Sequence, residues 1–189
     1  MLILVGEESS LPVRVARARY FASNGLGDGG YDEAWVRIPV GSFALFFPNT
    51  SGRVAAVIRH DLHHVVTGYA TSWQGEGEIG AWEIASGCGS FVAAWVLNLQ
   101  ALWIGFLVAP RRIWLAFARG RRANNLYRVR DVDGVLDLDL AELQSRLEPE
   151  RNLVVAGWSD LLRVAGWWGL AAIPNLLLPV GLLWSLLGD

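Results

Sequence analysis

The chain lacks lysine and is poor in cysteine, and each absence removes a class of chemistry. All 16 basic residues among its 189 are arginine, which excludes a Schiff-base lysine and the lysine of a phosphate-binding P-loop. The single cysteine, Cys88, excludes an intrachain disulfide and a metal site built from several cysteines. The formal net charge of −2 gives no overall signal for nucleic-acid binding, so no nucleic-acid partner is expected.

Charge of either sign is missing from two long stretches, residues 84–110 and 164–188. Apolar types make up 53% of the chain, and ten residues are tryptophan, which concentrates at bilayer interfaces. A helix needs about 20 apolar residues to cross a membrane. We therefore expect residues 164–188 to form an apolar membrane helix or hairpin. The first stretch is open between a membrane helix and a buried one.

Charge is segregated between these stretches. Residues 111–130 contain seven arginines and no acid, whereas residues 131–150 contain seven acids and one arginine. The arginines are expected either to meet lipid phosphates on the cytoplasmic side of a membrane or to pair with the acidic segment. The first ten residues have no basic segment before their short apolar run, so they do not match a secretory signal.

Local patterns predict a mainly α-helical fold with short extended pieces within residues 35–47. The helix at 11–23 carries three arginines, and it either lies on an anionic membrane or buries one face in the protein. Gly68 marks the end of a second helix, and the spacing of Asp139 and Glu142 is typical of a capping box. The expected helices are 11–23, 52–67, 75–86 and 140–148.

All three histidines lie in the segment RHDLHH, residues 59–64. At about 100° per residue, a helix places His60, Asp61 and His64 on one third of its circumference, while His63 points elsewhere. This face differs from the apolar stripe, so we expect it to lie outside the core. Two imidazoles and a carboxylate at this spacing form part of a divalent-metal site.

Glu76 follows His64 after eleven intervening residues and begins the next predicted helix. Glu83 lies on the same face of that helix, and Gly77 and Gly80 would allow a close approach of two helix backbones. The sequence thus predicts a metal site on two adjacent helices, formed by His60, Asp61, His64 and Glu76. The alternative is a polar helix face without a ligand.

The pattern His60-Asp61-x-x-His64-x11-Glu76 resembles the signature of the Coq4 family of ubiquinone-biosynthesis proteins. The neighbouring segments VVTGY (65–69) and GEGEIGAWEIASG (75–87) are similar to bacterial members. The resemblance covers residues 20–130. The long apolar C-terminus and the additional His63 depart from the family pattern.

The resemblance implies a helical Coq4-like domain, which we place at 1–150, and the uncharged C-terminal stretch predicts a membrane-associated segment at 151–189. It implies that His60, Asp61, His64 and Glu76 are both the metal-binding and the catalytic residues. The expected cofactor is a divalent metal, zinc in the first place, with Mg²⁺, Mn²⁺ and Fe²⁺ as alternatives. The expected location is the inner membrane of a bacterium, with the site facing the cytoplasm.

The activity implied by the resemblance is ubiquinone biosynthesis. The protein would remove the C1 carboxylate of a polyprenylated hydroxybenzoate oxidatively, as a lyase, or bind that isoprenoid lipid. Its partners would be the quinone precursor, membrane lipid, other quinone-biosynthesis proteins and a second copy in a homodimer. Two alternatives remain: a non-catalytic lipid-binding scaffold, and a zincin-like membrane metallohydrolase with Asp61 in the place of the usual glutamate.

Overall fold

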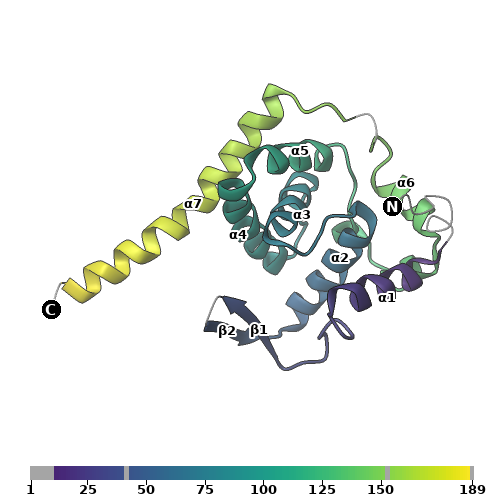
Figure 1. Cartoon of the computed structure of the whole chain (residues 1–189), viewed down its shortest axis with the longest axis horizontal. Helices are drawn as coiled ribbons and strands as arrows, with labels where there is room; N and C mark the ends of the chain where they lie inside the picture. The colour runs from purple at the N-terminus through teal and green to yellow at the C-terminus, as the bar shows by residue number, and fades with distance from the viewer. Residues whose placement is uncertain (1–10, 41–42, 152–153, 188–189) are drawn as a thin grey trace.

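The computed structural model describes residues 11–40, 43–151 and 154–187, which form a mainly α-helical protein (Figure 1). The short apolar end expected at residues 1–10 lies outside these ranges. A β-hairpin pairs β1 (Trp35–Val40) with β2 (Phe43–Pro48) in antiparallel register. The helices are α1 (Val13–Asn24), α2 (Ser51–Thr67), α3 (Trp73–Ser86), α4 (Val92–Val108), α5 (Pro110–Gly120), α6 (Leu140–Leu147) and α7 (Trp158–Leu187), with 3-10 turns η1 (Leu126–Arg128) and η2 (Gly134–Asp137) before α6.

The limits of α2 follow from the residues at its two ends. The Thr50 side chain accepts a hydrogen bond from the Arg53 N–H and caps the first turn. Gly68 ends the helix with φ 75°, a left-handed conformation that suits glycine, and its N–H donates to the His64 carbonyl. The predicted helix at 52–67 is therefore confirmed to within one residue.

Glycines bring α3 and α4 into close contact. A Cβ on Gly77 would lie 2.6 Å from the Gly105 Cα, and one on Gly80 would lie 3.0 Å from the Asn98 carbonyl oxygen. The predicted close approach is thus real, but its partner is α4 and not the histidine helix. The uncharged stretch at 84–110 accordingly becomes the end of α3, a bend and α4.

Two groups of buried apolar side chains form the core, and α2 contributes to both. One group joins α3, α4, α5 and α7, and the other joins α1, α2 and α6. Leu62 and Val66 of α2 are fully buried in the second group, so the histidine-bearing side of α2 is left to face α3. The candidate site therefore lies between the two groups.

At α1 one of two open alternatives is confirmed, and at α6 one local expectation is corrected. Val13 and Phe21 of α1 are buried, which confirms the alternative in which this helix buries one face in the protein. Helix α6 forms as predicted, but the Asp139 side chain makes no capping hydrogen bond. Asp139 instead takes part in an isolated β-bridge with Pro12, which holds its backbone in an extended conformation.

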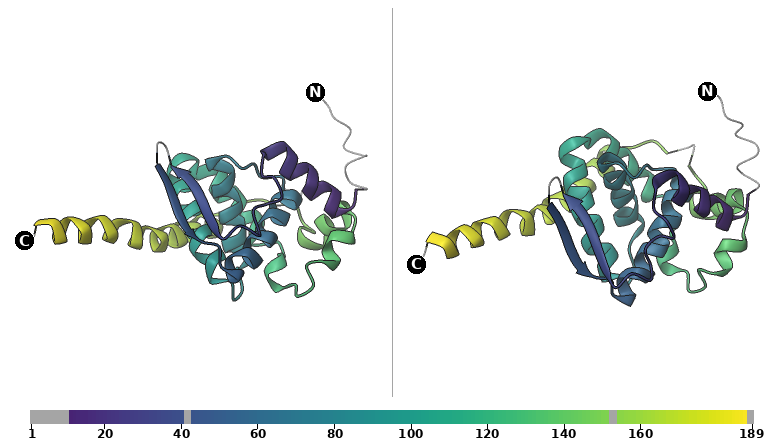
Figure 2. Two further views of the ribbon diagram at one scale, coloured as in Figure 1. Left: turned by 90° about the horizontal axis from the view of Figure 1, so that it is seen from below. Right: turned by 60° about the horizontal axis from the view of Figure 1, so that its bottom comes forward.

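The C-terminal uncharged stretch forms one helix, α7, and not a hairpin. Val164 and Ala171 are buried against α4 and α5, and the Trp168 indole N–H donates to the Trp103 carbonyl at 3.2 Å. Beyond this contact α7 extends away from the body (Figures 1 and 2). Within residues 11–40, 43–151 and 154–187, no helix is both long and apolar enough to cross a membrane, so the predicted span lacks support there.

Candidate metal centre

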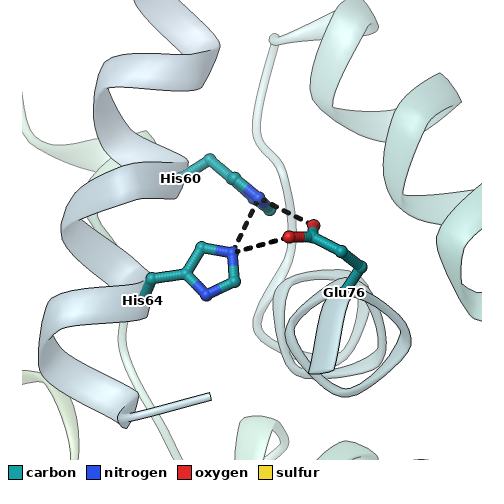
Figure 3. Close-up of side chains that lie close together, drawn as sticks. All are labelled: His60, His64 and Glu76. Carbon is teal, nitrogen blue, oxygen red and sulfur yellow. Dashed lines mark hydrogen bonds and ion pairs between the residues drawn. The ribbon is translucent and has the colours of Figure 1, made fainter. Parts of the chain in front are cut away.

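His60, His64 and Glu76 point toward one another from two helices (Figure 3). The Nε2 atoms of the two histidines are 3.1 Å apart, and each lies 3.5 Å from a carboxylate oxygen of Glu76. One ligand atom from each residue falls within 4.8 Å of the others. The site is open on one side, because the Glu76 side chain is 33% exposed while that of His64 is 1% exposed.

The distance between the two histidine nitrogens fits a tetrahedral ion. An ion with bonds of about 2.0–2.1 Å to nitrogen and oxygen keeps its ligand atoms about 3.3 Å apart. The two Nε2 atoms, 3.1 Å apart, lie close to that figure, while the two 3.5 Å contacts reach different oxygens of Glu76, Oε2 from His60 and Oε1 from His64. The three side chains therefore form a group that can hold a divalent cation.

Glu76 reaches this position because the chain turns sharply between α2 and α3. Gly75 lies against Ala70 so closely that a Cβ would meet its carbonyl oxygen at 2.0 Å, which requires glycine. The Ser72 side chain accepts from the Gly75 N–H and caps α3. Glu76 thus sits in the first turn, where the helix dipole favours a carboxylate.

Hydrogen bonds on the other ring nitrogens fix the histidine tautomers. His64 Nδ1 lies 2.9 Å from the Tyr69 carbonyl, which only accepts, so Nδ1 carries the proton. His60 Nδ1 lies 3.1 Å from Glu83 Oε1 and donates in the same way. Both Nε2 lone pairs are therefore directed at the same point, as they are in metal sites.

Two neutral imidazoles cannot hold their lone pairs 3.1 Å apart without a positive group between them. The charges and hydrogen bonds of Glu83 and Glu76 outweigh burial and raise the pKa of His60. Burial opposes ionisation of Glu76, but contacts with His60 and His64 lower its pKa to about 2. The site thus favours a cation, either a proton on His60 or a metal ion in its place.

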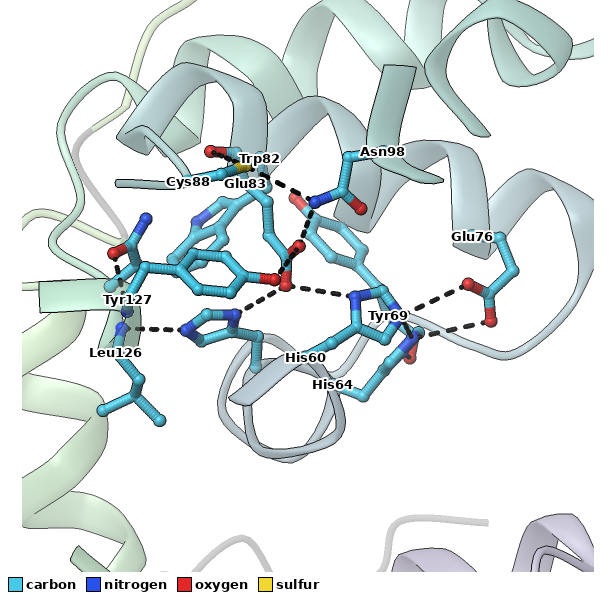
Figure 4. Close-up of polar contacts among 12 residues, drawn as sticks. His60, His64, Tyr69, Glu76, Trp82, Glu83, Cys88, Asn98, Leu126 and Tyr127 are labelled. Atoms are coloured by element: carbon cyan, nitrogen blue, oxygen red, sulfur yellow. Dashed lines mark hydrogen bonds and ion pairs between the residues drawn. The ribbon is translucent and has the colours of Figure 1, made fainter. Parts of the chain in front are cut away.

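Glu83 anchors His60 from behind (Figure 4). Its side chain is fully buried and accepts from His60, from His63 Nδ1 at 2.6 Å and from the Tyr127 hydroxyl at 2.7 Å, as well as from the Asn98 amide. These contacts outweigh burial and hold the pKa of Glu83 well below its ordinary value. The carboxylate is therefore ionised and fully hydrogen-bonded.

Asp61 is placed beside the three converging side chains and not among them. Its Oδ2 accepts a hydrogen bond of 2.6 Å from the Tyr31 hydroxyl. Asp61 is buried, and burial raises its pKa, although Tyr31 and the nearby imidazoles oppose that rise. Of the four predicted ligands, the structure thus brings together His60, His64 and Glu76.

The predicted histidine face is not outside the core. Asp61 and His64 are 8% and 2% exposed, because Tyr20 of α1 stacks on the His64 ring with centroids 5.5 Å apart. His63 is fully buried and lies outside the converging group, as predicted, but its Nδ1 shares the acceptor Glu83 Oε1 with His60. Its Nε2 accepts from the Leu126 N–H at 2.9 Å, so the ring is fixed at both nitrogens.

A groove of about 390 Å³ runs along α1 and reaches His64. Tyr20 and Tyr69 line it beside the histidine, and Leu11, Val65 and Leu140 supply apolar walls. A partly apolar molecule could therefore approach the site from this side.

Sequence reasoning missed the roles of Tyr31, Asn98 and Tyr127, which have no fixed spacing from the histidines. Glu83 was detectable, because it stands seven residues after Glu76, about two helical turns, on the same face. Both carboxylates indeed contact His60.

The chain was compared with models of known protein families, with curated proteins and with solved structures. None of the three comparisons produced a match.

Proposed function

We propose that the chain is a divalent-metal protein of the Coq4 type that acts on a polyprenylated hydroxybenzoate in ubiquinone biosynthesis. The observation that supports the metal is the convergence of two Nδ1-protonated imidazoles and a carboxylate on one point. The order and spacing of His60, His64 and Glu76 support the family assignment.

The donor set favours zinc among the metals considered. Two imidazole nitrogens and one carboxylate suit Zn²⁺ or Fe²⁺, whereas Mg²⁺ prefers oxygen ligands alone. Three protein ligands are the number found in catalytic zinc sites, while structural sites commonly have four. This count favours an enzyme over a lipid-binding scaffold.

The bound metal would act as a Lewis acid toward a phenolate or carboxylate oxygen of the substrate. His60, His64 and Glu76 would hold it, and Glu83 keeps His60 in the correct tautomer. Asp61 lies close enough to both histidines for their charges to lower its pKa, and it is placed to move a proton. The oxidant required for oxidative loss of CO2 would be dioxygen or a partner protein.

A membrane-bound lipid substrate requires a membrane-facing surface, and we place it on α4 and α7. Exposed apolar side chains follow the outer faces of these helices: Val92, Val96, Leu107 and Val108 on α4, and Leu162, Leu170, Ile173, Leu176 and Leu177 on α7. Arg111, which is exposed, lies in the first turn of α5, three residues after the end of α4, and could contact anionic headgroups. Arg112 instead donates to Glu78, and Arg119 and Arg121 pair with Glu148 and Asp160.

A metallohydrolase is the second candidate, favoured by one observation. Asp61 follows the first histidine and stays outside the ligand group, as the general-base glutamate does in the H-E-x-x-H pattern. The groove that reaches His64 would serve either substrate.

The test uses detergent-purified, metal-loaded protein and a prenylated hydroxybenzoate labelled in its carboxylate. Aerobic release of labelled CO2 by the wild type, and not by His64→Ala, is expected. Retention of the lipid without release by the wild type would favour the scaffold. Hydrolysis of a peptide or ester substrate with no CO2 release would favour the metallohydrolase.

A further inference from the structure

Asp61 is the one predicted ligand that lies outside the group of converging ligand atoms. It stands next to His60 and three residues before His64, so it shares their side of α2. Nevertheless its Oδ2 is occupied by the Tyr31 hydroxyl at 2.6 Å. Among the described residues, the group of converging ligand atoms is His60, His64 and Glu76.

Tyr31 is held in place independently of Asp61. The Asn49 side-chain amide donates to the carbonyls of Gly30, Tyr31 and Glu33 at 3.1, 3.3 and 2.8 Å. These bonds fix the loop that joins α1 to β1. The Tyr31 ring also packs edge-on against Phe21, with centroids 6.1 Å apart. The hydroxyl is therefore presented to Asp61 by a fixed loop.

We propose that Tyr31 is a positioning residue that holds Asp61 away from the metal and thereby keeps one coordination position open. This inference rests on the proposed metal centre. A carboxylate bonded to a fixed hydroxyl keeps its orientation, whereas a carboxylate without that bond can rotate toward a nearby cation. Four protein ligands would close the site, as in structural zinc centres, and three leave a position for an exogenous oxygen or nitrogen donor.

The test replaces the native metal with Co²⁺, whose visible absorption reports its coordination, and uses azide as a small exogenous ligand. The full-length chain is compared as wild type, Tyr31→Phe, Asp61→Asn and the double variant. Tyr20→Phe is the matched control, because it removes a hydroxyl beside His64 and leaves the Tyr31–Asp61 bond intact.

Azide should shift the Co²⁺ spectrum of the wild type, of Tyr20→Phe and of Asp61→Asn. In Tyr31→Phe the azide affinity should fall about tenfold or more, because Asp61 takes the open position. The double variant should regain the wild-type affinity, since asparagine in place of Asp61 is a much poorer ligand. The double variant also shows whether a loss in Tyr31→Phe arises from misfolding, because it carries the same loop change.

Three results would overturn the inference. Equal azide affinities in Tyr31→Phe and Tyr20→Phe would show that Tyr31 does not control access and would leave the metal centre standing. Loss of Co²⁺ in Asp61→Asn as complete as in His64→Ala would make Asp61 a ligand. Failure of the wild type to bind Co²⁺ would contradict the proposed metal centre and the inference together.

Discussion

The polar side chains in and around the candidate site are held in place by hydrogen bonds to neighbouring groups. His60, His63 and His64 each have one ring nitrogen committed to an acceptor, and Glu83 receives donors on both oxygens. A metal site needs this second layer of contacts, because it sets the tautomer and orientation of each ligand. The least replaceable residue outside the ligand group is therefore Glu83.

Replacing Glu83 with glutamine should weaken metal binding about 10–100-fold, since an amide supports the His60 Nδ1–H less well than a carboxylate. Isothermal titration with Zn²⁺ measures the change. Tyr127→Phe is the control, because it removes a donor to the other oxygen, Oε2, and leaves His60 bonded to Oε1. Equal losses in both variants would mean that Glu83 acts only through general stability.

Asp160 shows how a single carboxylate ties α7 to the body. It is fully buried, pairs with Arg121 and accepts from the Gly157 N–H at 2.9 Å. Burial opposes its ionisation, but these partners outweigh it and lower the pKa of Asp160. A lowered pKa in the folded state stabilises the protein above the ordinary value of about 3.9, and this contribution is lost as the pH falls below it.

Asp160→Asn should therefore lower the free energy of unfolding by about 2 kcal/mol at neutral pH. The difference from the wild type should shrink when unfolding is measured with urea as the pH falls from about 3.9 toward the lowered pKa of Asp160, because the unfolded chain takes up a proton first and the folded wild-type carboxylate follows only at lower pH. A difference that stays constant between neutral and acidic pH would contradict the role given to the Asp160 charge.

At the scale of elements, the position of α3 determines where Glu76 and Glu83 lie relative to the histidines. Packing against α4 in turn determines the position of α3. Gly77 and Gly105 let the two helices touch through their backbones, which turns the Glu76 and Glu83 side of α3 toward α2. The same contact lets Asn98 of α4 reach Glu83. The packing of two uncharged surfaces thus sets the geometry of a charged site.

Gly77→Ala should lower the free energy of unfolding by about 1–3 kcal/mol, because the new methyl group would meet backbone atoms of α4. Gly166→Ala on α7 is the matched control. No atom lies within 4 Å of the Cβ it would add, so it should leave stability unchanged or raise it by up to about 1 kcal/mol. Similar effects of the two substitutions in thermal unfolding would show that the α3–α4 contact is less close than described.

At the scale of the whole molecule, local patterns were sufficient for α1, α2, α3 and α6 and for the three side chains that converge, whereas α5 was not predicted and α7 was expected to be a membrane helix or hairpin. Thr50 and Gly68 mark the ends of α2, and the spacing from His60 to Glu76 is carried by one turn between two helices. Contacts between distant segments could not be predicted. Tyr31 reaches Asp61 from 30 residues away, and the burial of His64 depends on how α1 folds back over α2.

The outer faces of α4 and α7 should bind anionic membranes through their exposed apolar side chains. Val96→Asp combined with Leu177→Asp should weaken sedimentation with phosphatidylglycerol vesicles about tenfold or more, because two apolar contacts are lost and acidic charge is added. Phe46→Asp is the control, since Phe46 is equally exposed but lies on the hairpin. If all these variants bind vesicles as the wild type does, α4 and α7 do not form the membrane-facing surface.

The central claim is that His60, His64 and Glu76 hold a metal ion, and metal content tests it most directly. Detergent-purified wild-type protein, incubated with Zn²⁺ and freed of excess, should contain about one ion per chain by atomic emission. The His60→Ala/Glu76→Ala variant should contain none, while Glu142→Ala, on the distant helix α6, should match the wild type. Equal zinc in the double variant and the wild type, or none in either, would contradict the account.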